Sequence, residues 1–316
     1  MRILVVGAGA IGGYFGGRLL QAGRDVTFLV RPRRAEQLAR TGLSIRSPTG
    51  DVDLPAPTVQ ADDLREPFDL ILLSCKAYDL SDAMQSFAPA VGPDTAILPM
   101  LNGMRHLDVL EQRFGAGAVL GGWCAISVTL DPEGRILHLA DVHSLSFGER
   151  DGAATERTRA IASAFGGAKF EVRAVDAILQ EMWEKWVFIA TAAGITCLMR
   201  SAIGDIVAAG GADLANSLLD ECAGIAGQQG FPPSAAAMQR NRAMLTATGS
   251  GFTASMLRDV ERNARTEVDH VVGDLLRRAT TPANAQTLLR VAHAHLMAYE
   301  ARRARTQPAS AISESR

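Results

Sequence analysis

The first thirty residues alternate between apolar runs and a segment with helical spacing. Residues 2–6 form a near-continuous apolar run rich in β-branched side chains, the pattern of a strand buried on both faces. After it, Ile11, Phe15 and Leu19 recur at four-residue steps, which predicts a helix. Glycines fill the junction, and a second strand-like run follows at 25–30. The sequence therefore predicts a strand, a tight turn, a helix and a second strand.

The two halves of the chain differ in periodicity. The first half continues with strand-like runs at 43–46, 52–54, 69–74, 95–100, 119–129, 135–139, 144–147 and 169–172, and with helical segments at 34–40, 79–87 and 155–165. Beyond residue 175 the pattern is helical, at 178–199, 213–228, 234–245, 253–279 and 283–305. We expect a Rossmann-type α/β domain over 1–175, an all-α domain over 176–305 and a disordered tail over 306–316.

Composition narrows the class of protein. A length of 316 residues suits two domains, and a net charge of −2 provides no general attraction to nucleic acid or anionic membranes. The four cysteines form no C-x-x-C pair, so neither a metal site nor a disulfide framework is indicated. The first predicted strand begins at residue 2, so we expect no targeting peptide ahead of the fold, and the uncharged stretch 186–199 is too short to span a membrane. We expect a cytoplasmic protein.

The junction after the first strand reads Gly7-Ala8-Gly9-Ala10-Ile11-Gly12. In this G-x-G-x-x-G pattern Gly7 would permit the turn, Gly9 would let a pyrophosphate approach the backbone, and Gly12 would let helix and strand pack closely. The helix N-terminus attracts the anion. A glycine turn without a nucleotide is the weaker alternative, because strand, helix and second strand stand at the expected positions. We predict that these six residues bind a dinucleotide.

The end of the second strand indicates which dinucleotide binds. An NAD site usually carries Asp or Glu there, whereas this chain has Arg31 followed by Arg33 and Arg34. A guanidinium suits a 2′-phosphate, so we expect NADPH or NADP⁺, with Arg31 as first choice and Arg33 or Arg34 as second. A solvated basic turn is the alternative.

Lys76 and Asn102 follow the predicted strands at 69–74 and 95–100. In open parallel sheets, ligands bind beyond the carboxyl ends of the strands. We therefore expect both side chains at the ligand-binding edge of the sheet.

Two charged residues of the helical half stand on or beside predicted apolar surfaces. The predicted buried stripe of helix 253–279 consists of Met256, Val260, Ala264, Val271 and Leu275. Glu267 falls on that stripe, so it is either a buried structural partner or a site residue. Lys185 precedes the apolar run 186–190 and is either a proton donor or a lysine that extends into solvent. Ser255 is expected to make a local hydrogen bond near its helix start.

At these residues the chain resembles the ketopantoate reductase (2-dehydropantoate 2-reductase) family over nearly its whole length. The matching segments are the glycine motif, Arg31, 76–77, 102–104, 181–185, 255–259, 266–269 and 282–284. The resemblance implies an NADP-binding Rossmann domain followed by a helical domain similar to that of 6-phosphogluconate dehydrogenase.

The resemblance also implies roles for individual residues. Lys185 matches the family's catalytic lysine, the general acid that protonates the carbonyl oxygen, and Glu267 matches the carboxylate that holds the substrate hydroxyl and helps position the lysine. Asn102 matches an amide near the carbonyl and the nicotinamide ribose, Ser255 a ligand of the substrate carboxylate, and Lys76 a lysine beside the cofactor. These residues are the expected catalytic, substrate-binding and cofactor-binding set.

The chain departs from the family pattern at three positions. Family members commonly carry asparagines one and two turns after the lysine, where this chain has Ile189 and Ala193. Another asparagine, three residues before the serine, is replaced by Phe252. These replacements leave a more apolar pocket, so the sequence specifies the reaction class better than the substrate.

Three functions are compatible with these features. The leading hypothesis is NADPH-dependent reduction of 2-dehydropantoate to pantoate, a step of pantothenate and coenzyme A synthesis. The alternatives are a family reductase for a more apolar 2-oxo acid or ketone, and a non-catalytic NADP(H) sensor, which would need neither Lys185 nor Glu267. The expected partner is a small 2-oxo acid, without nucleic acid, membrane or metal. A homodimer and the direction of flux are left open.

Overall fold

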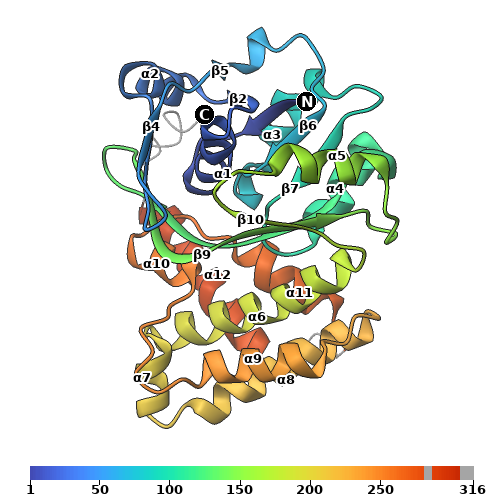
Figure 1. Cartoon of the computed structure of the whole chain (residues 1–316). Helices are drawn as coiled ribbons and strands as arrows, with labels where there is room; N and C mark the ends of the chain where they lie inside the picture. Colours follow the sequence, from blue (N-terminus) through green and yellow to red (C-terminus); the bar gives the residue numbers. More distant parts are fainter. Residues whose placement is uncertain (281–286, 307–316) are drawn as a thin grey trace. The chain divides into compact units, whose positions relative to one another are not determined.

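The predicted opening strand lies at the centre of a parallel sheet in the computed structural model, which describes residues 1–280 and 287–306. The strand order is β5-β2-β1-β6-β7, and the strands are β1 Arg2–Val6, β2 Asp25–Leu29, β5 Thr58–Val59, β6 Leu70–Leu73 and β7 Ala96–Pro99. β1 pairs in parallel with β2 on one side and with β6 on the other (Figure 1). The strand order therefore reverses at β1, and ligands of open α/β sheets bind beyond the carboxyl ends of the strands at such a point.

A second sheet packs against the other side of the first helix. Its order is β10-β9-β3-β4, with β8 paired to β9, and its strands are β3 Leu43–Arg46, β4 Val52–Leu54, β8 Gly121–Leu130, β9 Ile136–Gly148 and β10 Glu171–Ala174. The separate strands predicted at 135–139 and 144–147 are thus one strand. A register shift explains why the sequence pattern is interrupted there. Ile126 of β8 pairs with His143, but Val128 pairs with His138, and Leu139 and Val142 between them are exposed.

Glycines let the first helix, α1 (Ala10–Gln21), fit between the two sheets. A methyl group on Gly16 would meet the Phe28 ring at 2.7 Å on the parallel sheet. A methyl group on Gly17 would meet Leu43 at 2.6 Å on the second sheet. Backbone can approach side chains this closely only where no Cβ is present. The remaining α-helices of this half are α2 Pro32–Thr41, α3 Leu80–Phe87, α4 Arg105–Phe114 and α5 Glu156–Phe165.

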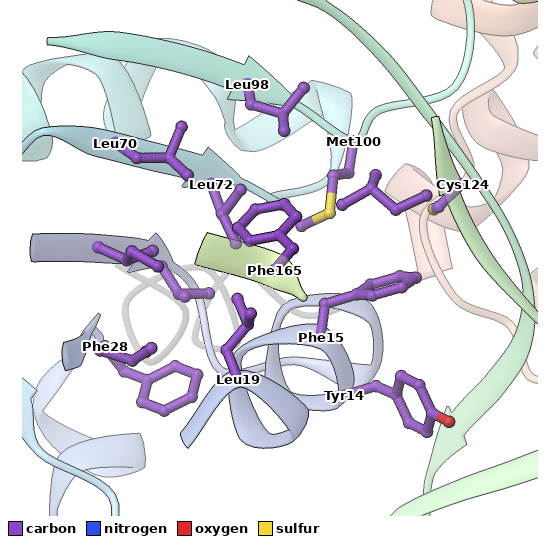
Figure 2. Packing of buried hydrophobic residues seen from close by; sticks show 14 of the residues in the cluster. Tyr14, Phe15, Leu19, Phe28, Leu70, Leu72, Leu98, Met100, Cys124 and Phe165 are labelled. Carbon is purple, nitrogen blue, oxygen red and sulfur yellow. The ribbon is translucent and has the colours of Figure 1, made fainter. Parts of the chain in front are cut away.

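The core between these elements contains the side chains that the spacing predicted. Phe15 and Leu19 of α1 are fully buried, and Figure 2 shows them among Phe28, Leu72 and Phe165. Each such side chain contributes roughly 1.5–3 kcal/mol by leaving water. The first β-α-β unit is therefore held by its own predicted apolar positions.

The rest of the chain is helical, as predicted, with no strand among its described residues. The elements are α6 Ile178–Met199, α7 Ile203–Ala208, α8 Ala212–Gln228, α9 Ala235–Leu245, α10 Ser255–Glu261, the π-helical η5 Asp269–Gly273, α11 Asp274–Arg278 and α12 Leu288–Thr306. Residues 281–286 and 307–316 lie outside the described residues, and so do the 282–284 match and nearly all of the predicted tail. Along 1–280 and 287–306, no helix has the length and apolar character needed to cross a membrane.

The prediction of one continuous helix over 253–279 is wrong. Asn263 adopts a left-handed conformation with φ +53°, and the Ala264 N–H donates to the Asp259 carbonyl at 2.8 Å. This bond, with the Asn263 N–H to Val260 O bond of 3.1 Å, is a Schellman motif that ends α10. Glu267 therefore stands immediately before the next helix and not in the middle of a stripe.

The chain divides into two units. Unit 1 comprises Met1–Leu101 and Arg105–Met182, and unit 2 comprises Asn102–Met104 and the described residues from Trp183 onward. The division falls inside α6, while the boundary predicted at 175/176 lies between β10 and this helix.

Unit 1 contains an arginine and two histidines packed around one tyrosine. The Tyr14 hydroxyl lies 2.6 Å from His143 Nδ1, and the His138 and His143 rings stack with centroids 5.1 Å apart. The Arg18 guanidinium is fully buried 5.2 Å from the Tyr14 ring centroid. Burial, and then the proximity of His138 and Arg18, hold the pKa of His143 below its ordinary value of 6.5.

We expect acid to destabilise the protein through His143. Between the lowered pKa and 6.5 the unfolded chain binds more protons at this ring than the folded chain, so stability falls as pH drops through 6.5. His143→Gln, whose amide oxygen can still accept the Tyr14 hydroxyl, should flatten the dependence of Tm on pH between about 7 and 5. His295→Gln, at an exposed position, is the control and should keep the wild-type slope.

Candidate functional site

The glycine motif of unit 1 forms the tight turn that the sequence predicts. Gly7 has φ +94°, a conformation that favours glycine, and its N–H donates to Leu29 O at 2.9 Å. A methyl group on Gly12 would overlap Ser74 Oγ and the Gly7 carbonyl oxygen. The turn, the start of α1 and the end of β6 are therefore packed to backbone contact, as a Rossmann turn requires.

The same turn leaves open backbone at the N-terminus of α1. A Cβ built on Gly9 meets no atom within 4 Å, and α1 has neither a side-chain cap nor an acidic residue in its first turn. The N–H groups of a first helical turn lack partners within the helix, and the helix dipole adds positive potential. This cradle fits the pyrophosphate of a dinucleotide. Ala8 is buried within it, while Ala10 and Ile11 are half-buried.

Ser74 supports the turn and was missed by sequence reasoning. It follows β6, and its hydroxyl lies 2.9 Å from Val6 O and 3.2 Å from Gly7 O, where it donates. Its position, two residues before Lys76 at the end of a buried strand, was the available signal. Lys76 itself is half-buried at the start of the 3₁₀ turn Ala77–Asp79. Because β6 is the parallel neighbour of β1, Lys76 lies at the same edge of the sheet as the glycine turn.

The three arginines after β2 have different environments. Arg31 is half-exposed at the N-cap of α2, with one guanidinium nitrogen 3.4 Å from Asp79 Oδ1. Arg33 is exposed. Arg34 donates to the Ala8 carbonyl at 3.1 Å and to Gln37 Oε1 at 2.7 Å, and burial lowers its pKa. Arg34 therefore braces the glycine turn, whereas Arg31 and Arg33 extend toward solvent.

Lys185 lies on α6 and belongs to unit 2. It is half-buried, and the next residue, Trp186, is buried and donates its indole N–H to the Val271 carbonyl at 2.8 Å. Val271 lies in η5, four residues after Glu267. The bond therefore joins the helix of Lys185 to the helix that Glu267 begins.

Glu267 is buried, with 8% of its surface exposed, and the preceding loop is fastened to α12. Glu300 accepts both the N–H and the hydroxyl of Thr266 at 2.7 Å, and the Tyr299 hydroxyl donates to the Ala264 carbonyl at 2.7 Å. The Glu267 carbonyl accepts the N–H groups of His270 and Val271. Hydrogen bonds before and after Glu267 thus hold the backbone from which its side chain extends.

Asn102 follows β7 and is grouped with unit 2. Its neighbour Gly103 has φ +79°, and a methyl group there would lie 3.0 Å from His270 Cδ2 and 3.1 Å from the His270 carbonyl oxygen. His270 is three residues after Glu267 and was missed by sequence reasoning. This contact brings Asn102 beside the start of the Glu267 helix.

Ser255 is the exposed first residue of α10, which begins after Ala254 without a side-chain cap. The loop before it reaches α6, because the Phe252 and Phe188 rings have centroids 5.8 Å apart. Unit 2 therefore carries Lys185 on α6, Glu267 and Ser255 on segments joined to α6, and Asn102 on a segment that contacts the Glu267 helix. Unit 1 carries the glycine motif, Arg31 and Lys76.

Known proteins match both halves of this chain. The family model described as ketopantoate reductase PanE/ApbA matches residues 3–152, and the model of the PanE/ApbA C-terminal domain matches residues 177–300. The uncharacterized oxidoreductase YkpB of Bacillus subtilis is 40% identical over 302 residues, which cover 95% of this chain and 99% of that protein. A 2-dehydropantoate 2-reductase of Archaeoglobus fulgidus is 28% identical over 279 residues, covering 88% and 90%.

Solved structures share the fold. The crystal structure of a 2-dehydropantoate 2-reductase from Geobacter metallireducens aligns with a TM-score of 0.85 at 27% identity, covering 94% of this chain and 99% of that one. This alignment includes both of the segments that the two family models match. The chain therefore belongs to the ketopantoate reductase family, oxidoreductases that act on a C=O or CH–OH group with a nicotinamide dinucleotide.

Proposed function

We propose that this chain catalyses the NADPH-dependent reduction of a 2-oxo acid to the 2-hydroxy acid. The observation that carries the proposal is the Trp186–Val271 hydrogen bond of 2.8 Å, which joins the helix of Lys185 to the helix that Glu267 begins. An ammonium group and a buried carboxylate on joined elements are suited to proton transfer at a carbonyl. A sensor of NADP(H) would need neither group.

The residues of unit 2 would divide the work at the carbonyl. When bound, the reduced nicotinamide supplies the hydride that the carbonyl carbon accepts. Lys185 Nζ donates a proton to the carbonyl oxygen as negative charge develops there, and the neutral amine regains a proton from solvent. Asn102 orients the carbonyl, Glu267 positions Lys185 and holds the hydroxyl of a hydroxylated substrate such as ketopantoate, and Ser255 binds the substrate carboxylate.

Unit 1 would hold the cofactor. The residues from Gly7 to Gly12 cradle the pyrophosphate at the N-terminus of α1, and Lys76 lies beside the cofactor. In the family form of the reaction the substrate is ketopantoate and the product pantoate, which would place the chain in pantothenate and coenzyme A synthesis. A homodimer is the assembly that we would test first by sedimentation.

Mixing the enzyme and NADPH with individual 2-oxo acids tests the reaction class. We expect the NADPH absorbance to decay with at least one 2-oxo acid and a matching 2-hydroxy acid to accumulate. Suppose instead that the protein binds NADPH tightly but turns over no acid in a panel of aliphatic, hydroxylated and aromatic members. That result would refute the reductase and favour the non-catalytic NADP(H) sensor.

Cofactor preference is expected to depend on Arg31. We expect NADPH to bind at least tenfold more tightly than NADH, about 1.4 kcal/mol, because a guanidinium makes a charge-assisted contact with the 2′-phosphate. Arg31→Ala should remove most of this preference in binding titrations. Arg33→Ala, two residues away at another exposed arginine, is the matched variant. Equal wild-type affinities would refute NADPH specificity, and loss with Arg33→Ala alone would move the contact to Arg33.

A further inference from the structure

Two apolar side chains remain partly exposed on an otherwise buried stretch of α6. From Trp186 to Cys197, only Phe188 and Ile189 are half-buried while every other residue is buried. They lie three and four residues after Lys185, which places them on its face of the helix. The surface next to the Lys185 ammonium along α6 is therefore hydrocarbon.

A third apolar side chain extends this surface. The Phe252 ring lies against Phe188, with centroids 5.8 Å apart and planes inclined by 38°, and it is also half-buried. The backbone of Phe252 is fastened to the start of α7, since its carbonyl accepts the Ile203 N–H at 3.0 Å. Ser250 O accepts the Gly204 N–H at 2.8 Å and secures the same loop. The aromatic pair is therefore held in place without a ligand.

Two threonines close to these residues in the sequence already have partners. The Thr253 hydroxyl and carbonyl oxygens accept Arg258 Nη1 at 3.4 and 3.0 Å. Thr191 on α6 donates its hydroxyl to the Val187 carbonyl at 2.8 Å. Against the hydrocarbon of Phe188, Ile189 and Phe252, a polar group on a substrate side chain loses water without gaining a hydrogen bond from these three residues.

We propose that Phe188, Ile189 and Phe252 form the side-chain subsite of the enzyme and select 2-oxo acids whose side chain is branched or aromatic and carries no polar group. The inference rests on the proposed reaction. A substrate that presents its carbonyl to Lys185 would place its side chain against Phe188 and Ile189, one helical turn away, and against the Phe252 ring that packs on Phe188. Ketopantoate, whose side chain ends in a hydroxyl, is the disfavoured member of the class.

Two acids that differ by one hydroxyl test the subsite. Ketopantoate and its deoxy analogue, 3,3-dimethyl-2-oxobutanoate, have the same branched skeleton. We expect kcat/KM to be about tenfold higher or more for the deoxy acid. The upper limit is roughly 10²-fold, the most by which an apolar pocket discriminates against an added hydroxyl. Phenylglyoxylate should also be reduced in preference to ketopantoate. A wild-type enzyme that prefers ketopantoate would overturn the inference.

Substitutions locate the selectivity. Phe252→Asn should lower the deoxy-to-hydroxy ratio of kcat/KM by about tenfold, and Ile189→Asn should act in the same direction if Phe252→Asn does not fold. Met199→Asn, at an exposed position at the end of α6, is the control and should keep the wild-type ratio. An unchanged ratio in the folded subsite variant counts against the inference. If the wild-type enzyme oxidises NADPH with none of the acids, the proposed reaction itself is refuted.

Discussion

Lys185→Ala is expected to lower kcat by roughly 10²-fold or more on the best 2-oxo acid, the usual effect of removing a positioned general acid. Without the ammonium, the developing oxyanion must take its proton from water. Cofactor affinity should change little, because the glycine turn belongs to unit 1 and Lys185 to unit 2. Steady-state kinetics and NADPH titrations of the same preparation measure both quantities.

Two further variants separate proton donation from charge and from substrate binding. Lys185→Arg keeps the positive charge but cannot release a proton near neutral pH, so kcat should remain low while KM stays near the wild-type value. With ketopantoate, Glu267→Ala should raise KM more than it lowers kcat, since a ligand of a substrate hydroxyl acts in ground and transition states alike. Near-normal kcat in Lys185→Ala would mean that another group supplies the proton.

Gly9→Ala is expected to weaken dinucleotide binding by at least tenfold, about 1.4 kcal/mol, while leaving the thermal stability of the free protein unchanged. A Cβ at Gly9 meets no protein atom within 4 Å, and the backbone has φ −77°, which alanine adopts without strain. The methyl group would instead occupy the space into which a pyrophosphate approaches. Binding titrations and calorimetry of the unliganded protein test the two halves of this expectation.

Gly12→Ala is the matched variant and should behave in the opposite way. Its methyl group would overlap the Gly7 carbonyl oxygen, which is backbone and cannot rotate away, so the free energy of unfolding should fall by about 1–3 kcal/mol. If Gly9→Ala bound the dinucleotide as tightly as the wild type, the ligand would not approach this turn. If Gly9→Ala lowered Tm as much as Gly12→Ala, the methyl group at position 9 would meet protein atoms, and the claim of open space beside Gly9 would be refuted.

Elements with strong local signals were predicted closely. The predicted helix 178–199 coincides with α6, because its long apolar stretch has few competing structures. The β1-α1-β2 unit also agrees, since β-branched strands, glycines and four-residue apolar spacing act over a few residues. The short elements β5, α4 and α7 were missed. Of the ten residues in α4, only His106, Leu107 and Leu110 are buried, so its apolar pattern is sparse.

The break at Asn263 shows why spacing misplaced Glu267. Met256 and Leu275 are buried as predicted, yet they lie on two helices separated by a Schellman motif. A three- and four-residue repeat continues across such a break by chance, whereas the left-handed residue depends on the bonds that close the motif. The Glu267 side chain is buried because Glu300 and Tyr299, more than thirty residues later, fasten the loop before it.

The sequence by itself determined the two kinds of secondary structure, the dinucleotide turn and the identity of the charged residues, because these depend on periodicity and on residue types at short spacing. The tertiary structure alone decided that Ser74 supports the Gly7 turn, that Gly103 packs on His270, and that Phe188 meets Phe252 beside Lys185. Such contacts join residues from distant parts of the chain. Their geometry depends on how whole elements pack, which no local pattern specifies.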